Sequence, residues 1–237
     1  MILLNQEKFH NYDIIEYDVV DSTMNLVKNF PENTVVIAGK QESGRGKGGR
    51  VWNSENNNNL YFSLLLKADK TKLDYSQLSF VVSVALRQAI ESFDSKNNSI
   101  VSKWPNDILI ADKKVCGILL EFDCLTKNLA IGCGVNVDSF PDNAMFKATS
   151  LKKEGIFATR YGILREFLNN FDYLLKKWEL EGFRPIRELW LKSCYRLNEE
   201  IAVNGQKGIF IDIDNDGTLI VKLDDGENMY VKSGDVF

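Results

Sequence analysis

The chain has 237 residues, of which 44% are hydrophobic and 26% are charged, and its formal net charge is -4. This composition indicates a globular protein with one sizeable core and room for a small appended unit. The acidic balance excludes the overall basic footprint of a duplex-binding protein, and no apolar run is long enough for a signal-peptide core or a membrane span. We therefore expect a cytoplasmic protein whose main partner is neither DNA nor a membrane.

Cysteine and histidine, which build many catalytic and metal sites, are few and scattered. The one histidine, His10, lies in a polar stretch and is interpreted as a surface residue. The cysteines show no close-paired spacing that would favour a zinc site or a disulfide framework; they are Cys116, Cys124, Cys133 and Cys194. Catalysis by a histidine base or a covalent nucleophile is not expected, and no protein metal site is predicted.

Strands and two helices are predicted in the first part of the chain. Apolar patterns predict strands at Ile14–Val20, Thr34–Lys40 and Leu60–Lys67. Asp21-Ser22-Thr23 offers N-cap chemistry for a short helix through Phe30. Apolar residues at helical spacing predict a long helix over Asp74–Phe93, and the run Asn56–Asn59 is interpreted as a solvated loop.

The remaining elements divide into two groups. Further strands are predicted at Ser99–Lys103, Ile108–Ala111, Val115–Phe122 and Leu129–Val137, and helices at Thr159–Leu180 and Pro185–Tyr195. Short turns between the four consecutive strands imply antiparallel pairing. From about Arg196 the pattern changes to short alternating strands, typical of a small meander or barrel of hairpins, with turns at Asn204-Gly205, Asp216-Gly217 and Asp225-Gly226.

The most informative segment is Gln41–Trp52, which places four glycines and three cations within seven residues. The glycines allow backbone N–H groups to approach a ligand closely, and Arg45, Lys47 and Arg50 supply positive charge. The segment formally satisfies G-x-G-x-x-G, but no helix follows it to hold a pyrophosphate, and the spacing of a Walker A loop also fails. It is therefore interpreted as an anion-binding loop, with a flexible solvated loop as the alternative.

Lys103-Trp104-Pro105-Asn106-Asp107 forms a second polar cluster, at a predicted junction between strands. The lysine suits phosphate neutralisation, the amide suits hydrogen bonding, and the carboxylate suits contact with Mg²⁺ or with the loop. An ordinary tight turn with Asx chemistry is the alternative.

Two further features lie within predicted strands. Lys114 begins an apolar strand, where a lysine is either a solvated end residue or a group that captures a carboxylate. Gly132 and Gly134 lie inside the last predicted strand of the larger group. Such glycines indicate either a bulge or the close approach of a ligand or another part of the chain.

Together these motifs resemble those of the biotin protein ligase family. The matching segments occur in the family's order and cover most of the first 195 residues: Asp21-Ser22-Thr23, Gln41–Trp52, Lys103–Asp107, Lys114–Leu119, Gly132–Asn136 and Ala148–Leu151. The resemblance implies an α+β fold with a mixed, mostly antiparallel sheet and flanking helices, similar to class II aminoacyl-tRNA synthetases. It also implies a small C-terminal SH3-like β-barrel, with residues 1–195 as the catalytic domain and 196–237 as the C-terminal domain.

The resemblance further implies a reaction and a set of site residues. An enzyme of this family forms biotinyl-5′-AMP from biotin and ATP with Mg²⁺, and then transfers biotin to a lysine of a biotin carboxyl carrier protein, a subunit of acetyl-CoA carboxylase. The residues expected at biotin are Ser22, Thr23, Met24, Gln41, Gly44, Arg45, Gly46, Lys47, Lys114, Gly117 and Gly134, of which Lys114, Arg45 and Lys47 are the catalytic candidates. Those expected at the nucleotide are Arg50, Trp52, Lys103, Asn106, Asp107 and Asn136.

The sequence departs from the family pattern in three places. Lys47 replaces the usual second arginine of the loop, which keeps the charge but loses the planar two-pronged contact. Met24 stands where many members carry asparagine, so a side-chain hydrogen bond is lost. Only about a dozen residues precede the first predicted strand, too few for a helix-turn-helix domain, so a monofunctional ligase is expected, as a monomer or homodimer.

Two other functions remain open at this point. A lipoate or octanoate ligase or transferase has a related fold and is the nearest enzymatic alternative. A non-catalytic nucleotide- or RNA-binding protein is the alternative from another class.

Overall fold

A computed structural model describes residues 1–54, 57–67, 75–141 and 147–237 of the chain. The strands of its larger sheet are β1 (Leu3–Phe9), β2 (Tyr12–Val20), β3 (Thr34–Gln41), β4 (Leu60–Lys67), β5 (Ile100–Lys103), β6 (Asp107–Ile110), β7 (Lys113–Asp123) and β8 (Asn128–Val135). They lie in the order β1-β2-β3-β4-β8-β7-β6-β5. The β2–β3 pair is parallel and the other pairs of this sheet are antiparallel, which confirms the predicted mixed, mostly antiparallel sheet.

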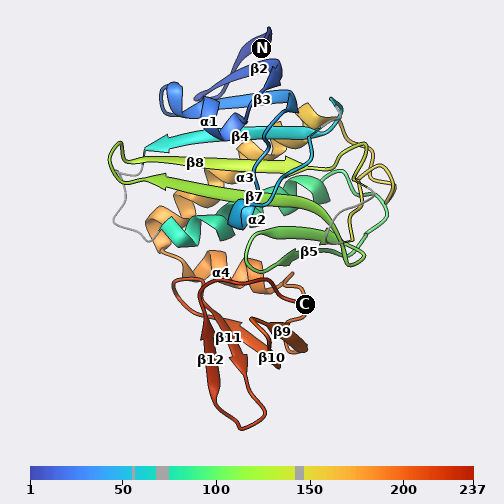
Figure 1. Ribbon diagram of the computed structural model, residues 1–237, viewed down its shortest axis with the longest axis vertical. Helices are drawn as coiled ribbons and strands as arrows, with labels where there is room; N and C mark the ends of the chain where they lie inside the picture. The colour runs from blue at the N-terminus through green and yellow to red at the C-terminus, as the bar shows by residue number, and fades with distance from the viewer. Residues whose placement is uncertain (55–56, 68–74, 142–146) are drawn as a thin grey trace.

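Two long helices cover one face of this sheet (Figure 1). They are α2 (Leu78–Glu91) and α3 (Arg160–Glu181), and a shorter helix, α4 (Arg184–Leu191), lies between the sheet and the C-terminal strands. Thr159 caps α3, because its side chain accepts a hydrogen bond from the backbone N–H of Gly162. The apolar residues at helical spacing that predicted α2 are buried in the core.

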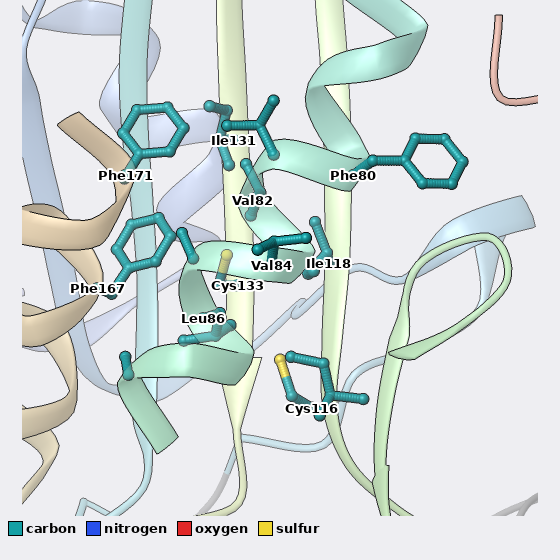
Figure 2. Packing of buried hydrophobic residues seen from close by; sticks show 14 of the residues in the cluster. Phe80, Val82, Val84, Leu86, Cys116, Ile118, Ile131, Cys133, Phe167 and Phe171 are labelled. Carbon is teal, nitrogen blue, oxygen red and sulfur yellow. The ribbon is translucent and has the colours of Figure 1, made fainter. Parts of the chain in front are cut away.

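The main core lies between α2, α3 and the inner face of the sheet. Figure 2 shows side chains of the helices, such as Val84 and Phe167, packed against Ile118, Ile131 and Cys133 of β7 and β8. All five are buried. Each fully buried aliphatic or aromatic side chain of this kind stabilises the fold by roughly 1.5–3 kcal/mol.

The opposite face of the sheet has a much smaller cover. It consists of α1 (Thr23–Leu26) and a 3-10 turn (Val27–Asn29), which share a second, small apolar cluster formed by Met24, Val27, Val36, Leu65 and Ala130. Ser22 precedes α1 as predicted, but its side chain makes no capping hydrogen bond, so the predicted cap chemistry is wrong. The short cover leaves the central part of this face open for a pocket.

The C-terminal residues form a separate meander. Its strands are β9 (Glu200–Val203), β10 (Gln206–Ile213), β11 (Leu219–Lys222) and β12 (Asn228–Val231), in the order β12-β11-β10-β9. The three predicted Asn-Gly and Asp-Gly turns connect consecutive strands, and their glycines adopt positive φ. The predicted meander of short hairpin strands is therefore confirmed, and it has four strands.

Several boundaries differ from the sequence-based expectation. β1 was not predicted; it is an edge strand whose polar residues are largely exposed and which is held by its ladder to β2, so it has little apolar alternation to detect. Asn59 is wrongly assigned to a solvated loop, because it is 3% exposed and its side chain bonds the backbone at Asp138 and Ser139. Two predicted positions, Asp74 and Asn56, lie outside the described residues. None of the helices in the described ranges combines the length and apolar character that a membrane span requires.

A buried ion pair between β2 and α3 gives a test of this fold. Glu16 is 2% exposed and accepts hydrogen bonds from Arg160 and Tyr161. We expect Arg160→Met to lower the free energy of unfolding by about 3–5 kcal/mol in urea denaturation, because it leaves a buried carboxylate without its cation. The control is Arg165→Met, which removes an exposed pair with Glu7 and is expected to cost at most about 1 kcal/mol. Equal losses for the two variants would contradict the buried role of Glu16.

Candidate active site

A pocket of about 750 Å³ lies on the sheet face opposite α2 and α3. Its floor contains three glycines, Gly117 of β7 and Gly132 and Gly134 of β8. Strand residues alternate between the two faces, and the neighbours Ile118 and Cys133 point into the helix-covered core, so the glycines belong to the open face (Figure 2). Gly117 and Gly134 are direct cross-strand partners in a regular register. The bulge considered for β8 is therefore wrong, and close approach is the reason for its glycines.

Two large side chains occupy the space that the glycines leave. A Cβ atom on Gly134 would lie 2.3 Å from Cε2 of the Trp52 indole, and one on Gly117 would lie 2.7 Å from its Cζ3. A Cβ atom on Gly132 would lie 2.6 Å from Sδ of Met24. Any larger residue at these three positions would force the tryptophan or the methionine away from the sheet.

One end of the pocket is polar and already ordered by hydrogen bonds. Oε1 of Gln41 accepts from the backbone N–H of Thr23 at 2.9 Å and from its hydroxyl at 3.0 Å, while Nε2 of Gln41 donates to Ser54 at 2.9 Å. Ser63 donates to the Thr23 hydroxyl at 2.8 Å. The Ser22 hydroxyl is buried and has no hydrogen-bond partner among the described residues, so it is the polar group at this end with unused capacity.

The first cation of the glycine-rich loop pairs with the sheet. Nη2 of Arg45 lies 3.1 Å from Oε2 of Glu121 on β7, and Nζ of Lys28 lies 2.9 Å from the same oxygen. Arg45 and Val51 form a β-bridge, which closes the base of the loop.

The other two loop cations contact the C-terminal segment. Nη1 and Nη2 of Arg50 donate to the two carboxylate oxygens of Asp235 at 3.0 and 3.2 Å, a bidentate pair. Nζ of Lys47 donates to the carbonyl of Gly234 at 3.1 Å. Burial lowers the pKa of Lys47, and the Asp235 carboxylate opposes that shift. The loop therefore spans from the large sheet to the C-terminal unit.

Lys114 lines the same pocket and contacts Asp107 and Trp52. Its Nζ forms an ion pair of 2.6 Å with Oδ1 of Asp107 and lies 5.4 Å from the centre of the Trp52 ring. As for Lys47, burial lowers the pKa of Lys103, whose ammonium group faces the Phe237 ring. The Asp107 carboxylate opposes that shift. Partly desolvated ammonium groups of this kind gain stability when an anion approaches.

The pocket brings together most of the predicted site residues. Its lining includes Thr23, Met24, Gln41, Arg45, Gly46, Lys47, Arg50, Trp52, Asn106, Lys114, Gly117, Gly134 and Asn136. Ser22, Gly44, Lys103 and Asp107 are not among the lining residues, although Ser22, Gly44 and Asp107 adjoin residues that are. Gly44 shapes the loop, since a Cβ there would lie 2.4 Å from the carbonyl oxygen of Trp52.

Two of the predicted nucleotide contacts also serve the scaffold. The side-chain amide of Asn106 donates to the carbonyl of Ile118 at 2.6 Å, and that of Asn136 donates to the carbonyl of Thr149 at 3.0 Å. Both residues thus fix the strands around the pocket through their amide nitrogens, so the side-chain oxygens are the atoms that could contact a ligand.

Sequence reasoning missed several members of the site. Gly132 was noticed only as part of a glycine-containing strand, and Asn59 was hidden in a run of identical residues although it lines the pocket. Glu121 and Asp235 carried no motif at all, because each is far in sequence from the arginine that it contacts. The β-strand period offered a signal for Glu121, since it lies on the same face as Gly117.

Comparison with known proteins gives a consistent assignment. The model of the Biotin/lipoate A/B protein ligase family matches residues 16–138, and that of the Biotin protein ligase C terminal domain matches residues 197–237. The bifunctional ligase/repressor BirA of Bacillus spizizenii is 34% identical, over 90% of this chain and 70% of the relative. The biotin–[acetyl-CoA-carboxylase] ligase of Paracoccus denitrificans is 32% identical, over 90% of this chain and 94% of the relative.

A solved structure supports the same assignment at the level of the fold. The biotin protein ligase from Aquifex aeolicus, in complex with biotin and ATP, superposes with a TM-score of 0.84 and 27% identity, covering 97% of this chain and 98% of that one. The family models, the relatives and this structure agree on one assignment: the chain belongs to the biotin protein ligase family.

Proposed function

We propose that this chain is an ATP-dependent ligase that activates biotin as biotinyl-5′-AMP and transfers the biotinyl group to a lysine of a carrier protein. The observation that carries the proposal is one continuous pocket that joins an ordered polar end, at Thr23 and Gln41, to a group of cations, in a chain of this family. A carboxylic acid and a nucleoside triphosphate fit such a pocket side by side.

The first step must overcome repulsion between two anions. Unit negative charges about 4 Å apart repel by roughly 4 kcal/mol at an effective dielectric constant of 20. Arg45, Lys47 and Lys114 line the same pocket and would hold the biotin carboxylate while it attacks the α-phosphate of ATP. Each is positioned by a partner in the scaffold, so little reorganisation is needed when the substrates meet.

The polar end suits the ureido head group of biotin. Thr23 and Gln41 fix each other, and the buried Ser22 hydroxyl has an unused hydrogen-bonding capacity that a ligand carbonyl or N–H satisfies. Met24 covers Gly132 next to them and gives the head group an apolar neighbour. Ser22, Thr23 and Gln41 are therefore the proposed specificity contacts for biotin.

The nucleotide would lie toward Trp52, Arg50 and Lys103. Mg²⁺ is expected to accompany ATP, and it commonly uses one or two carboxylates together with substrate phosphates. Asp107, a mostly buried carboxylate paired with Lys114 beside the pocket, fits this requirement. When bound, the ion would neutralise charge on the leaving pyrophosphate.

The second step needs no covalent intermediate on the protein. The amine of the carrier lysine attacks the carbonyl carbon of the mixed anhydride, and AMP leaves with the bonding electron pair. The glycine-rich loop would exclude water from the anhydride, with Gly46 allowing its backbone to lie close to the ligand. The proposed acceptor is a biotin carboxyl carrier domain, because relatives are named as ligases of acetyl-CoA carboxylase.

The finer description of the fold belongs to the same proposal. We place the catalytic domain at residues 1–195 and the C-terminal domain at 196–237, which the separate family match beginning at residue 197 supports. A class II synthetase-like sheet and an SH3-like tail are the proposed types, supported by the mostly antiparallel large sheet and the small meander.

The direct test combines binding and transfer. Calorimetric titration with biotin should show binding, and addition of ATP and a carrier domain should yield a biotinylated lysine. Lipoate that binds and transfers in place of biotin would favour the lipoate alternative. Failure to release pyrophosphate from ATP with either acid would contradict an enzymatic function.

Lys114 gives the first site-specific prediction. We expect Lys114→Ala to abolish adenylate formation, because the carboxylate loses its cation at the point of attack. Pyrophosphate release in the presence of biotin and ATP measures this step. The matched control is Lys113→Ala, whose side chain pairs with Glu154 instead, and which should retain release. A Lys114→Ala protein with the wild-type rate would overturn the assignment.

Arg45 gives the second prediction, on retention of the intermediate. We expect Arg45→Gly to leak free biotinyl-adenylate, because the loop loses its tie to the sheet and one contact to the ligand. Biotin attached to lysines of an unrelated protein in the same tube measures the leak, with ATP omitted as the background. No increase over the unsubstituted protein would count against a retaining role for the loop.

Gly134 tests the geometry of the floor. We expect Gly134→Ala to raise the KM for ATP about tenfold, because the added Cβ displaces the Trp52 indole and an aromatic contact to a base is worth roughly 1–3 kcal/mol. Cys133→Ala is the control, since its side chain faces the helices and its loss should affect stability without changing this KM. Initial rates at varied ATP concentrations give the KM of each protein. Equal KM values for the unsubstituted protein and the two variants would refute the packing argument.

A further inference from the structure

Glu121 follows Gly117 by four residues in β7, so both residues lie on the face of the strand that carries the pocket. One of its oxygens, Oε2, accepts from two cations on different elements, Arg45 of the glycine-rich loop at 3.1 Å and Lys28 at 2.9 Å. Glu121 pairs across the sheet with Ala130, which belongs to the small apolar cluster under α1. The carboxylate is therefore on the open face of β7, next to the small apolar cluster.

This single carboxylate joins the two segments that cover the pocket. Lys28 belongs to the 3-10 turn that follows α1, and α1 carries Thr23 and Met24 of the pocket lining. Arg45 is the first cation of the loop that lies over the floor. Through Glu121, the loop and the α1 segment are tied to the same point of β7.

The contact suits a role in positioning more than a role in stability. The side chains of Arg45, Lys28 and Glu121 are 38%, 37% and 28% exposed, and partly exposed ion pairs contribute little to folding. The β-bridge to Val51 fixes the backbone of Arg45 but not its long side chain, so the guanidinium is oriented by its contact with Glu121. The contact with Glu121 uses one terminal nitrogen of a group that has five N–H donors, which leaves donors free for a ligand.

We propose that Glu121 is a positioning residue of the ligase reaction, which holds Arg45 over the pocket so that the activated acid stays bound until the acceptor lysine arrives. The role rests on the proposed function and extends it to a residue outside the glycine-rich loop. Glu121 acts through Arg45 and does not touch the reacting atoms.

The test measures a leak ratio, which is the biotin attached to an unrelated protein divided by the pyrophosphate released in a single turnover. We expect Glu121→Gln to raise this ratio about fivefold, the upper end of what the loss of a partly exposed ion pair allows. The control is Glu179→Gln, which removes the same charge from an exposed side chain of α3 that has no hydrogen bond or ion pair in the described part of the chain. It should leave the ratio unchanged.

A double-mutant cycle separates positioning from a general structural effect. If Glu121 acts through Arg45, then adding Glu121→Gln to Arg45→Gly raises the leak ratio by less than about twofold further, because the two changes remove one interaction. Melting temperatures of all variants show whether folding is affected. A purely structural role would lower the melting temperature and would act equally in both backgrounds.

The outcomes are distinct. A leak ratio for Glu121→Gln that equals that of the unsubstituted protein or of Glu179→Gln overturns the proposal, and so does a full fivefold increase on top of Arg45→Gly. Pyrophosphate release by the unsubstituted protein is measured first. Its absence would overturn the proposed function and this role together, whereas its presence with equal leak ratios would overturn the role of Glu121 alone.

Discussion

The site depends on the absence of side chains from one face of two paired strands. Gly117 and Gly134 lie opposite each other on β7 and β8, and a Cβ on either would come within 2.7 Å of the Trp52 indole. Because strand residues alternate, the same strands present Ile118 and Cys133 to the helices on the other face. Core and pocket floor are thus specified by one alternating pattern, and a change of register by one residue would destroy both.

The second requirement is a scaffold that keeps several cations in one small volume. Arg45, Lys47, Arg50 and Lys114 line the same pocket and would repel one another without compensation. Their partners come from separate parts of the fold: Glu121 of β7, the Gly234 carbonyl and Asp235 of the C-terminal segment, and Asp107 of β6. The positive groups are consequently positioned before any anion binds, which is the arrangement that electrostatic catalysis requires.

The parts of the fold that depend on local residue patterns could be predicted from the sequence. The apolar strand at Leu60–Lys67 and the Asp-Gly and Asn-Gly turns are local signals, and the structure confirms them. β1 was missed because an exposed edge strand depends on its ladder more than on its own residues. Asn59 differs from the exposed Asn57 only by where the fold places it, and Glu121 and Asp235 contact arginines 76 and 185 positions away.

Contacts between residues far apart in sequence also join the C-terminal unit to the loop and to the β5–β6 turn. The C-terminal unit contacts two segments of the larger unit: Gly234 and Asp235 hold the glycine-rich loop, while Trp104, in the turn between β5 and β6, donates its indole N–H to the carbonyl of Gly217 at 3.0 Å. A small meander has little core of its own, so its position relies on such contacts. The loop in turn relies on the meander for two of its three cations. Neither unit therefore fixes the anion-binding geometry alone, and the site belongs to the junction between them.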